Sequence, residues 1–66
     1  MKIKRCAVKV ITIDGRICWL AGFLDVDHNV PLFSAEPRYF PVHLALDFSI
    51  QLRRFYSIVQ VVCLNV

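Results

Sequence analysis

The stretch Cys6-Ala-Val-Lys-Val-Ile-Thr-Ile-Asp-Gly-Arg-Ile-Cys-Trp-Leu-Ala-Gly-Phe23 carries the strongest structural signal in this sequence. Two runs rich in β-branched and aromatic residues flank the single pair Asp14-Gly15. Such a pair between apolar runs is typical of a β-hairpin with a two-residue type I′ turn, because that turn needs positive φ at both central positions. We therefore expect strands at about Arg5–Ile13 and Arg16–Leu24, joined at Asp14-Gly15.

The length of the turn decides which side chains share a face of the hairpin. A two-residue turn at Asp14-Gly15 places Val10 opposite Trp19 and Cys6 opposite Phe23. The face with these large aromatics is expected to form the core. The other face is apolar in its middle and basic at its edges.

This second face is the candidate partner-binding surface, because apolar residues that no element of their own chain covers usually mark an interface. The occupant would be a target protein or a second copy of the chain, through sheet packing or edge-strand pairing. In the alternative, the segment around Leu32-Phe33 or a different hairpin register covers the face. The candidate binding residues are Lys9, Ile11, Ile13, Arg16, Cys18 and Leu20.

Two further strands are expected outside the hairpin. Pro31-Leu-Phe-Ser34 follows the turn-rich segment Asp25–Asn29, and it predicts a short third strand that turns back along the second. Ser57–Val66 is an almost unbroken apolar run. Such a run is typical of a strand that lies centrally in its sheet or is covered on both faces.

The segment from Val42 onward fits two kinds of structure. Its apolar residues alternate as in a strand. A stripe at helical spacing is formed by Leu44, Phe48, Leu52 and Phe55. We favour a helix over Val42–Tyr56, because Pro41 suits the start of a helix and Arg53-Arg54 suits its positively charged end.

These elements predict an α+β fold, in which one helix packs on one face of a small, mainly antiparallel sheet of order ββ(β)αβ. We expect residues 1–66 to form a single domain. A chain of this length buries only about 60% of the surface that it exposes when unfolded. Since little core can be spared for a deep catalytic pocket, we expect no enzymatic activity and no catalytic residues.

The composition bounds the location of the protein. The apolar fraction is 58%, yet no run reaches the ~18 uncharged residues of a membrane span. Met1-Lys-Ile-Lys-Arg5 leads into an alternating strand and not into a signal peptide. Cys6, Cys18 and Cys63 are an odd number of cysteines that fits no disulfide framework, so we expect buried, reduced thiols. The protein is expected to be cytoplasmic, with no membrane partner.

Metal binding is weakly indicated. The ligand spacing of an EF-hand calcium loop is matched by Asp25, Asp27, Asn29 and Glu36. Val30 stands where that loop needs a glycine, and a strand precedes it where a helix should, so a polar turn is the preferred interpretation. His28, His43 and the cysteines lack the spacing of a zinc module. We expect no metal and no cofactor.

Nucleic acid is the less favoured partner. The net charge of +3 is only mildly basic, and the basic residues are spread along the chain. If the hairpin face proves to be core, Arg53 and Arg54 on the expected helix are the alternative binding residues.

A resemblance to a group of proteins rests on the order of five segments. They are Trp19-Leu-Ala-Gly-Phe23, Asp27-His-Asn-Val-Pro-Leu-Phe-Ser34, Tyr39-Phe40, Ala45–Leu52 and Val59-Gln-Val-Val62. This order resembles the small ββαβ proteins encoded by bacteriophages, some of which, including anti-CRISPR inhibitors, block host defence complexes by binding them. The resemblance implies a non-enzymatic protein of the host cytoplasm that binds and inhibits a host protein complex. The alternative is a small nucleic-acid-binding or regulatory module.

Overall fold

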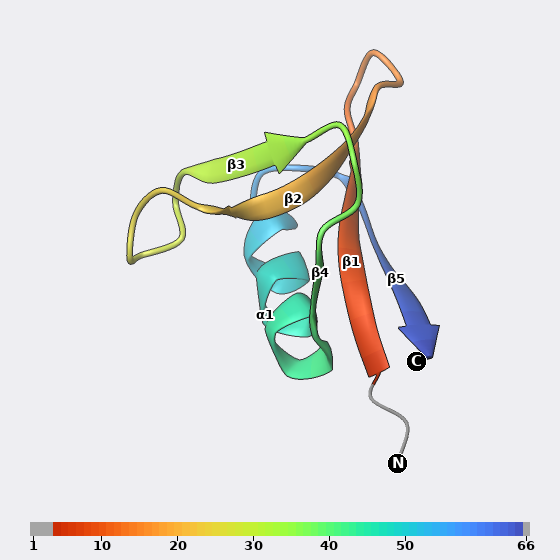
Figure 1. Cartoon of the computed structure of the whole chain (residues 1–66). Helices are drawn as coiled ribbons and strands as arrows, with labels where there is room; N and C mark the ends of the chain where they lie inside the picture. Colours follow the sequence, from red (N-terminus) through yellow and green to blue (C-terminus); the bar gives the residue numbers. More distant parts are fainter. Residues whose placement is uncertain (1–3, 66) are drawn as a thin grey trace.

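The computed structural model describes residues 4–65, which form a single antiparallel sheet with one helix on one of its faces (Figure 1). The elements are β1 (Lys4–Ile11), β2 (Ile17–Phe23), β3 (Pro31–Ser34), β4 (Tyr39–Pro41), α1 (Val42–Leu52) and β5 (Ile58–Asn65). The predicted α+β class is confirmed, and β3 pairs with β2 as expected. β4 was not predicted. The expected end of the last strand at Val66 lies outside the described residues.

β1 is the central strand of the sheet. β5 pairs with it along its whole length, from Lys4↔Asn65 to Ile11↔Ile58. On its other side β1 pairs with β4 near its N-terminal end and with β2 near its C-terminal end. β2 runs away from β1 at a steep angle (Figure 1). The expectation that the last strand lies centrally or is covered on both faces is therefore wrong. Within residues 4–65 β5 pairs with β1 alone, and Ile58, Val62 and Leu64 are exposed on one of its faces.

The hairpin turn between β1 and β2 contains three residues, not two. Thr12 and Arg16 close the turn, since the Thr12 N–H donates to the Arg16 carbonyl at 2.9 Å. The Gly15 N–H donates to the Thr12 carbonyl at 2.9 Å, and Gly15 has a φ of +85°. This is the geometry of a type I turn followed by one left-handed residue, the usual form of a three-residue hairpin loop. The predicted type I′ turn is wrong, although Gly15 does supply the positive φ.

The extra residue moves the side chains of β2 from Ile17 to Leu20 to the face opposite the expected one. The register is Lys9↔Trp19 and Val10↔Cys18. Trp19 therefore shares a face with Lys9, whereas Leu20 shares a face with Val8 and is fully buried. The expected core face with Trp19, and the expected outward position of Leu20 and Cys18, are both wrong.

A register shift between Leu20 and Gly22 in the β2–β3 pair places Phe23 on the same side of the sheet as Leu20, the side that α1 covers. Without it, Leu20 and Phe23 would point to opposite faces, because side chains alternate along a strand. Leu20 is in the core, and Phe23 packs against it. Phe23 also stacks on His28, with ring centroids 4.6 Å apart, and meets Phe48 of α1 edge to face at 5.2 Å.

α1 confirms the helical interpretation of the segment after Pro41, but it ends at Leu52 and not at Tyr56. The Tyr56 N–H donates to the Leu52 carbonyl, and the chain turns there towards β5. The buried residues of α1 are Ala45, Ser49 and Leu52, so the predicted stripe is displaced. The Ser49 hydroxyl donates to the Leu46 carbonyl at 2.7 Å, which satisfies this buried polar group.

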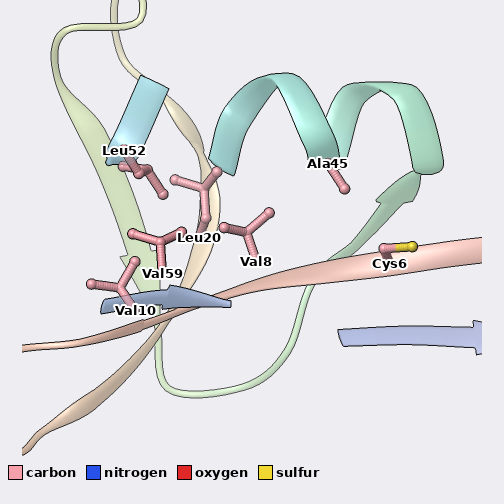
Figure 2. Close-up of a cluster of buried hydrophobic side chains, with 7 residues drawn as sticks. All are labelled: Cys6, Val8, Val10, Leu20, Ala45, Leu52 and Val59. Atoms are coloured by element: carbon pink, nitrogen blue, oxygen red, sulfur yellow. The ribbon is translucent and has the colours of Figure 1, made fainter. Parts of the chain in front are cut away.

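The core lies between α1 and one face of the sheet. Figure 2 shows Leu20 and Val8 beneath the helix, close to Leu52. The cluster of buried residues consists of Cys6, Val8, Val10, Leu20, Ala45, Leu52 and Val59. The side chains that β1 contributes come from alternate positions, as a strand with one face on the core requires.

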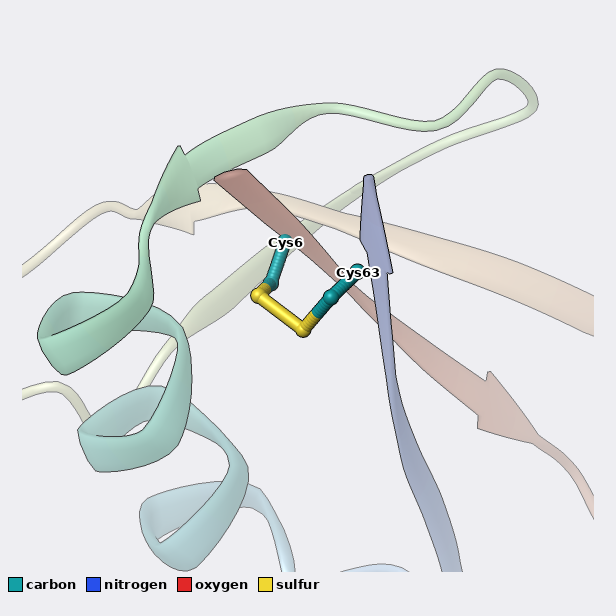
Figure 3. Close-up of a disulfide and its surroundings, with 2 residues drawn as sticks. All are labelled: Cys6 and Cys63. Atoms are coloured by element: carbon teal, nitrogen blue, oxygen red, sulfur yellow. A yellow bond between two sulfur atoms is a disulfide. The ribbon is translucent and has the colours of Figure 1, made fainter. Parts of the chain in front are cut away.

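A disulfide joins β1 to β5. Cys6 and Cys63 are directly opposite each other in the register, and their sulfur atoms are bonded (Figure 3). Cys6 is fully buried, Cys63 is exposed, and Cys18 is a half-buried free thiol. The expectation of reduced thiols is therefore wrong for Cys6 and Cys63. The expected burial is confirmed for Cys6 and wrong for Cys63.

Candidate partner-binding surface

The six residues predicted to bind a partner do not lie on one surface. Leu20 is core, and Cys18 is half-buried on the helix side of the sheet. Lys9 and Ile11 do lie together on the face that α1 leaves uncovered. Ile13 is fully exposed at the tip of the turn, beside Arg16.

We call the face of the sheet opposite α1 the outer face. Its side chains form four rows across the strands, given by the register. The rows are Ile17–Ile11–Ile58, Trp19–Lys9–Gln60, Tyr39–Ala7–Val62 and Pro41–Arg5–Leu64. Three of the four rows are thus mainly apolar. The predicted surface of the hairpin is replaced by one that spans β1, β2, β4 and β5.

Large apolar side chains of the outer face are open to solvent. Ile17 is 54% exposed, Ile58 45% and Leu64 46%. Tyr39 and Val62 are exposed to a similar extent. Ile17 and Ile58 flank Ile11 in the first row, whereas Tyr39, Val62 and Leu64 are neighbours in the third and fourth rows. The exposed apolar side chains therefore form two groups on either side of Lys9 and Gln60, and grouped exposed apolar side chains are typical of protein-binding surfaces.

Positive charge accompanies the apolar rows. Lys9 lies in the second row, with its Nζ 6.0 Å from the centre of the Trp19 ring. Arg5 stands in the fourth row and is exposed. Arg16 at the hairpin end is turned towards Asp14, with its Nε 3.0 Å from the carboxylate, so its charge is partly neutralised. Lys9 and Arg5 both stand on the central strand β1, so the face is suited to an apolar partner surface that carries acidic residues opposite β1.

A hollow of about 580 Å³ adjoins the outer face at the hairpin end of the sheet. Ile11 belongs to both, since it stands in the first row and also lines the hollow. The lining residues are Ile11, Thr12, Ile13, Asp14, Phe55, Tyr56 and Ser57. Ile13 and Phe55 are largely exposed within it. A partner side chain could therefore enter the hollow while the rest of the partner covers the rows.

The alternative binding residues, Arg53 and Arg54, lie in the turn after α1. Both are exposed, and the Arg54 guanidinium donates to the Gln51 side chain at 3.3 Å. It also lies 5.7 Å from the centre of the Phe55 ring, which lines the hollow. The two arginines are thus close in sequence to the hollow but are not part of the outer face.

Sequence reasoning missed most of the outer face. A two-residue turn predicts Trp19 in the core, whereas the three-residue turn places Trp19 and Ile17 on the outer face. Ile58, Val62 and Leu64 were missed because their strand was expected to be covered. The register of β5 required knowledge of its distant partner β1, but the three-residue turn was a recognised alternative for Asp-Gly hairpins.

The segment that matches an EF-hand spacing forms a hydrogen-bonded turn. The Asp25 carboxylate accepts from the N–H of Asn29 at 2.9 Å and from that of Val30 at 2.8 Å. These bonds, that of Val30 above all, lower the pKa of Asp25 from its ordinary value of 3.8, against the opposing effect of desolvation. Among residues 4–65, no three His, Cys, Asp or Glu side chains are grouped as a metal site would need.

In the described part of the chain, α1 falls short of the length and apolar character that would let a helix cross a membrane. A comparison of the chain with protein-family models, with curated proteins and with solved structures finds no match. The fold and surface therefore define only a class, that of small α+β proteins whose helix covers one face of an antiparallel sheet and leaves the other face open.

Proposed function

We propose that this chain is a non-enzymatic protein that acts by binding another protein with its outer face. The single observation that carries the proposal is the set of neighbouring, exposed apolar rows on the side of the sheet that α1 does not cover. Desolvation of such rows by a partner supplies the free energy of association. The positive residues Arg5 and Lys9 favour a partner whose surface carries acidic groups.

The expected partner is a host protein complex that is inhibited when the chain covers it. This part of the proposal rests on the resemblance to small bacteriophage proteins. Its place of action would then be the host cytoplasm. Nucleic acid is the second candidate, supported only by the net charge of +3.

A capture experiment with bacterial lysate tests the proposal. The bait is the wild-type chain, with Ile17→Glu as the test variant and Ile50→Glu as the control. Ile17 is 54% exposed on the outer face, and Ile50 is 58% exposed on α1, so both changes leave the core intact. We expect a protein that wild type and Ile50→Glu retain after nuclease treatment, and that Ile17→Glu loses.

Two results would overturn the proposal. Retention of the partner by Ile17→Glu would show that the outer face does not bind it. Loss of the partner after nuclease treatment would favour nucleic acid. Inhibition is then measured on the captured complex, whose activity should fall as wild-type chain is added and stay unchanged with Ile17→Glu.

A further inference from the structure

We propose that two copies of the chain associate through β5, which pairs antiparallel with β5 of the second copy across a two-fold axis. The sheet then continues from one copy into the other. This inference concerns the edge of the sheet and not its outer face, so it does not depend on the proposed function.

β5 is an open edge of eight residues with an uncharged composition. All eight of its residues pair with β1, and within residues 4–65 no strand pairs with its other side. It contains no charged residue and no proline, and its pairing with β1 shows no register shift. Charges, prolines and bulges are the features by which edge strands avoid pairing with other chains. β5 has none of them.

The backbone groups free for pairing follow from the geometry of the β1–β5 ladder. The Cα atoms of Cys6 and Cys63 are 3.9 Å apart. Such a short distance belongs to a pair that is not hydrogen-bonded, because hydrogen-bonded antiparallel pairs have Cα atoms about 5.5 Å apart. The N–H and C=O of Cys63 therefore point away from β1. Since directions alternate along a strand, those of Val61 and Val59 also point to the open edge.

A two-fold axis through Val61 satisfies these groups and aligns residues 58–64 of the two strands, all of β5 except Asn65. Val61 then pairs with Val61 of the second copy, and Val59 pairs with Cys63 of the second copy. On the outer face, Ile58 lies opposite Leu64 of the second copy, and Gln60 lies opposite Val62. Each pair is uncharged, so no like charges meet, and the apolar side chains become cross-strand neighbours.

This self-complementarity is the reason to assign the edge to a second copy and not to a strand of another protein. An antiparallel strand that meets β5 should be uncharged, with apolar residues opposite Ile58 and Leu64. β5 itself meets both conditions in the two-fold register. Association also joins the outer faces of the two copies into one continuous surface, because Ile58 and Leu64 occupy the first and fourth rows.

A charge-exchange experiment tests the pairing and its register. Ile58→Lys and Leu64→Glu each place a charge at a position that is about half exposed in the monomer, at 45% and 46%, so each variant should fold. We expect the wild type to be dimeric by sedimentation, and each variant alone to be largely monomeric at the same concentration. An equimolar mixture of the two should regain dimers, because the introduced lysine of one copy then faces the introduced glutamate of the other. High salt should weaken the mixed dimer.

Amide hydrogen exchange supplies the second measurement. In the wild-type dimer the N–H groups of Val59, Val61 and Cys63 should exchange slowly, and they should exchange faster in the monomeric Ile58→Lys variant. The inference is wrong if the wild type is monomeric across the accessible range of concentrations, or if both single variants remain dimeric. It is also wrong if the mixture stays monomeric, or if a dimer forms without protection of these three amides.

Discussion

Asp25 shows how a single side chain can hold a connection in place. Its carboxylate accepts backbone N–H groups from Asn29 and Val30, and the Leu24 N–H donates to the Val30 carbonyl just outside them. Within this loop His28 takes a φ of +57°, and its ring stacks on that of Phe23. The acidic residues that suggest a calcium loop in the sequence thus organise a turn.

The lowered pKa of Asp25 makes the stability of the chain depend on pH. The charged carboxylate is favoured in the folded state, so its stabilising effect is complete above the unfolded pKa near 3.8 and is lost as the pH falls through the lower folded value. We expect Asp25→Asn to lower the melting temperature at neutral pH, and the difference from wild type to shrink in acid. Thermal unfolding at several pH values measures this. Asp27→Asn, in the same loop, is the control, and an equal effect there would contradict the role of Asp25.

For the turn between β1 and β2, the sequence predicted where a residue of positive φ is needed but not how many residues the turn contains. Gly15 fits both a two-residue type I′ turn and the observed three-residue turn, because each places a glycine in the left-handed region. The Thr12 side chain, which donates to the Asp14 carboxylate, favours the longer loop. Such local polar contacts are not visible as a periodic pattern.

β2 is the element on which the interpretation of the hairpin depends. We expect Leu20→Ala to lower the free energy of unfolding by about 2–5 kcal/mol, since a large, fully buried side chain leaves a cavity. Ile17→Ala should cost clearly less, because more than half of this side chain is already in water. Urea denaturation of both variants measures the difference. A larger loss for Ile17→Ala would restore the two-residue turn and reverse the two faces.

Of the other elements, α1 could be predicted from the sequence and β4 could not. α1 was correctly predicted as a helix after Pro41, and it ends early because the chain turns at Arg53 to reach β5. β4 has only three residues, too few for a periodic signal. β2 pairs only with the C-terminal half of β1, so the N-terminal half of β1 is free to pair with β4.

For the molecule as a whole, the Cys6–Cys63 disulfide ties together strands that are 57 residues apart in sequence. An odd number of cysteines gave no reason to expect it, since the pairing depends on β1 and β5 lying side by side. The fold class could be predicted from local patterns, but this long-range register could not. Disulfides persist mainly in oxidising compartments. In the host cytoplasm, where the chain is proposed to act, Cys6 and Cys63 would be reduced.

Loss of the disulfide should therefore lower the free energy of unfolding of the entire domain. Closing a loop of this length removes enough unfolded-state entropy to contribute about 4 kcal/mol. This is a large share of the roughly 3–10 kcal/mol expected for a domain of 66 residues. We expect Cys63→Ser to lower the urea midpoint strongly, a reductant to affect the wild type in the same way, and Cys18→Ser to have little effect. A Cys63→Ser variant as stable as the oxidised wild type would contradict this.

The same bond turns residues 6–63 into a covalent ring. A protease that cuts one peptide bond inside the ring, for example in the exposed part of the loop at 24–30, adds a water molecule but releases no fragment. Both halves stay attached through sulfur, with β1 and β5 still paired. Release of a piece from inside the ring consequently needs a second event after the first cut, either another hydrolysis within residues 6–63 or reduction of the Cys6–Cys63 bond.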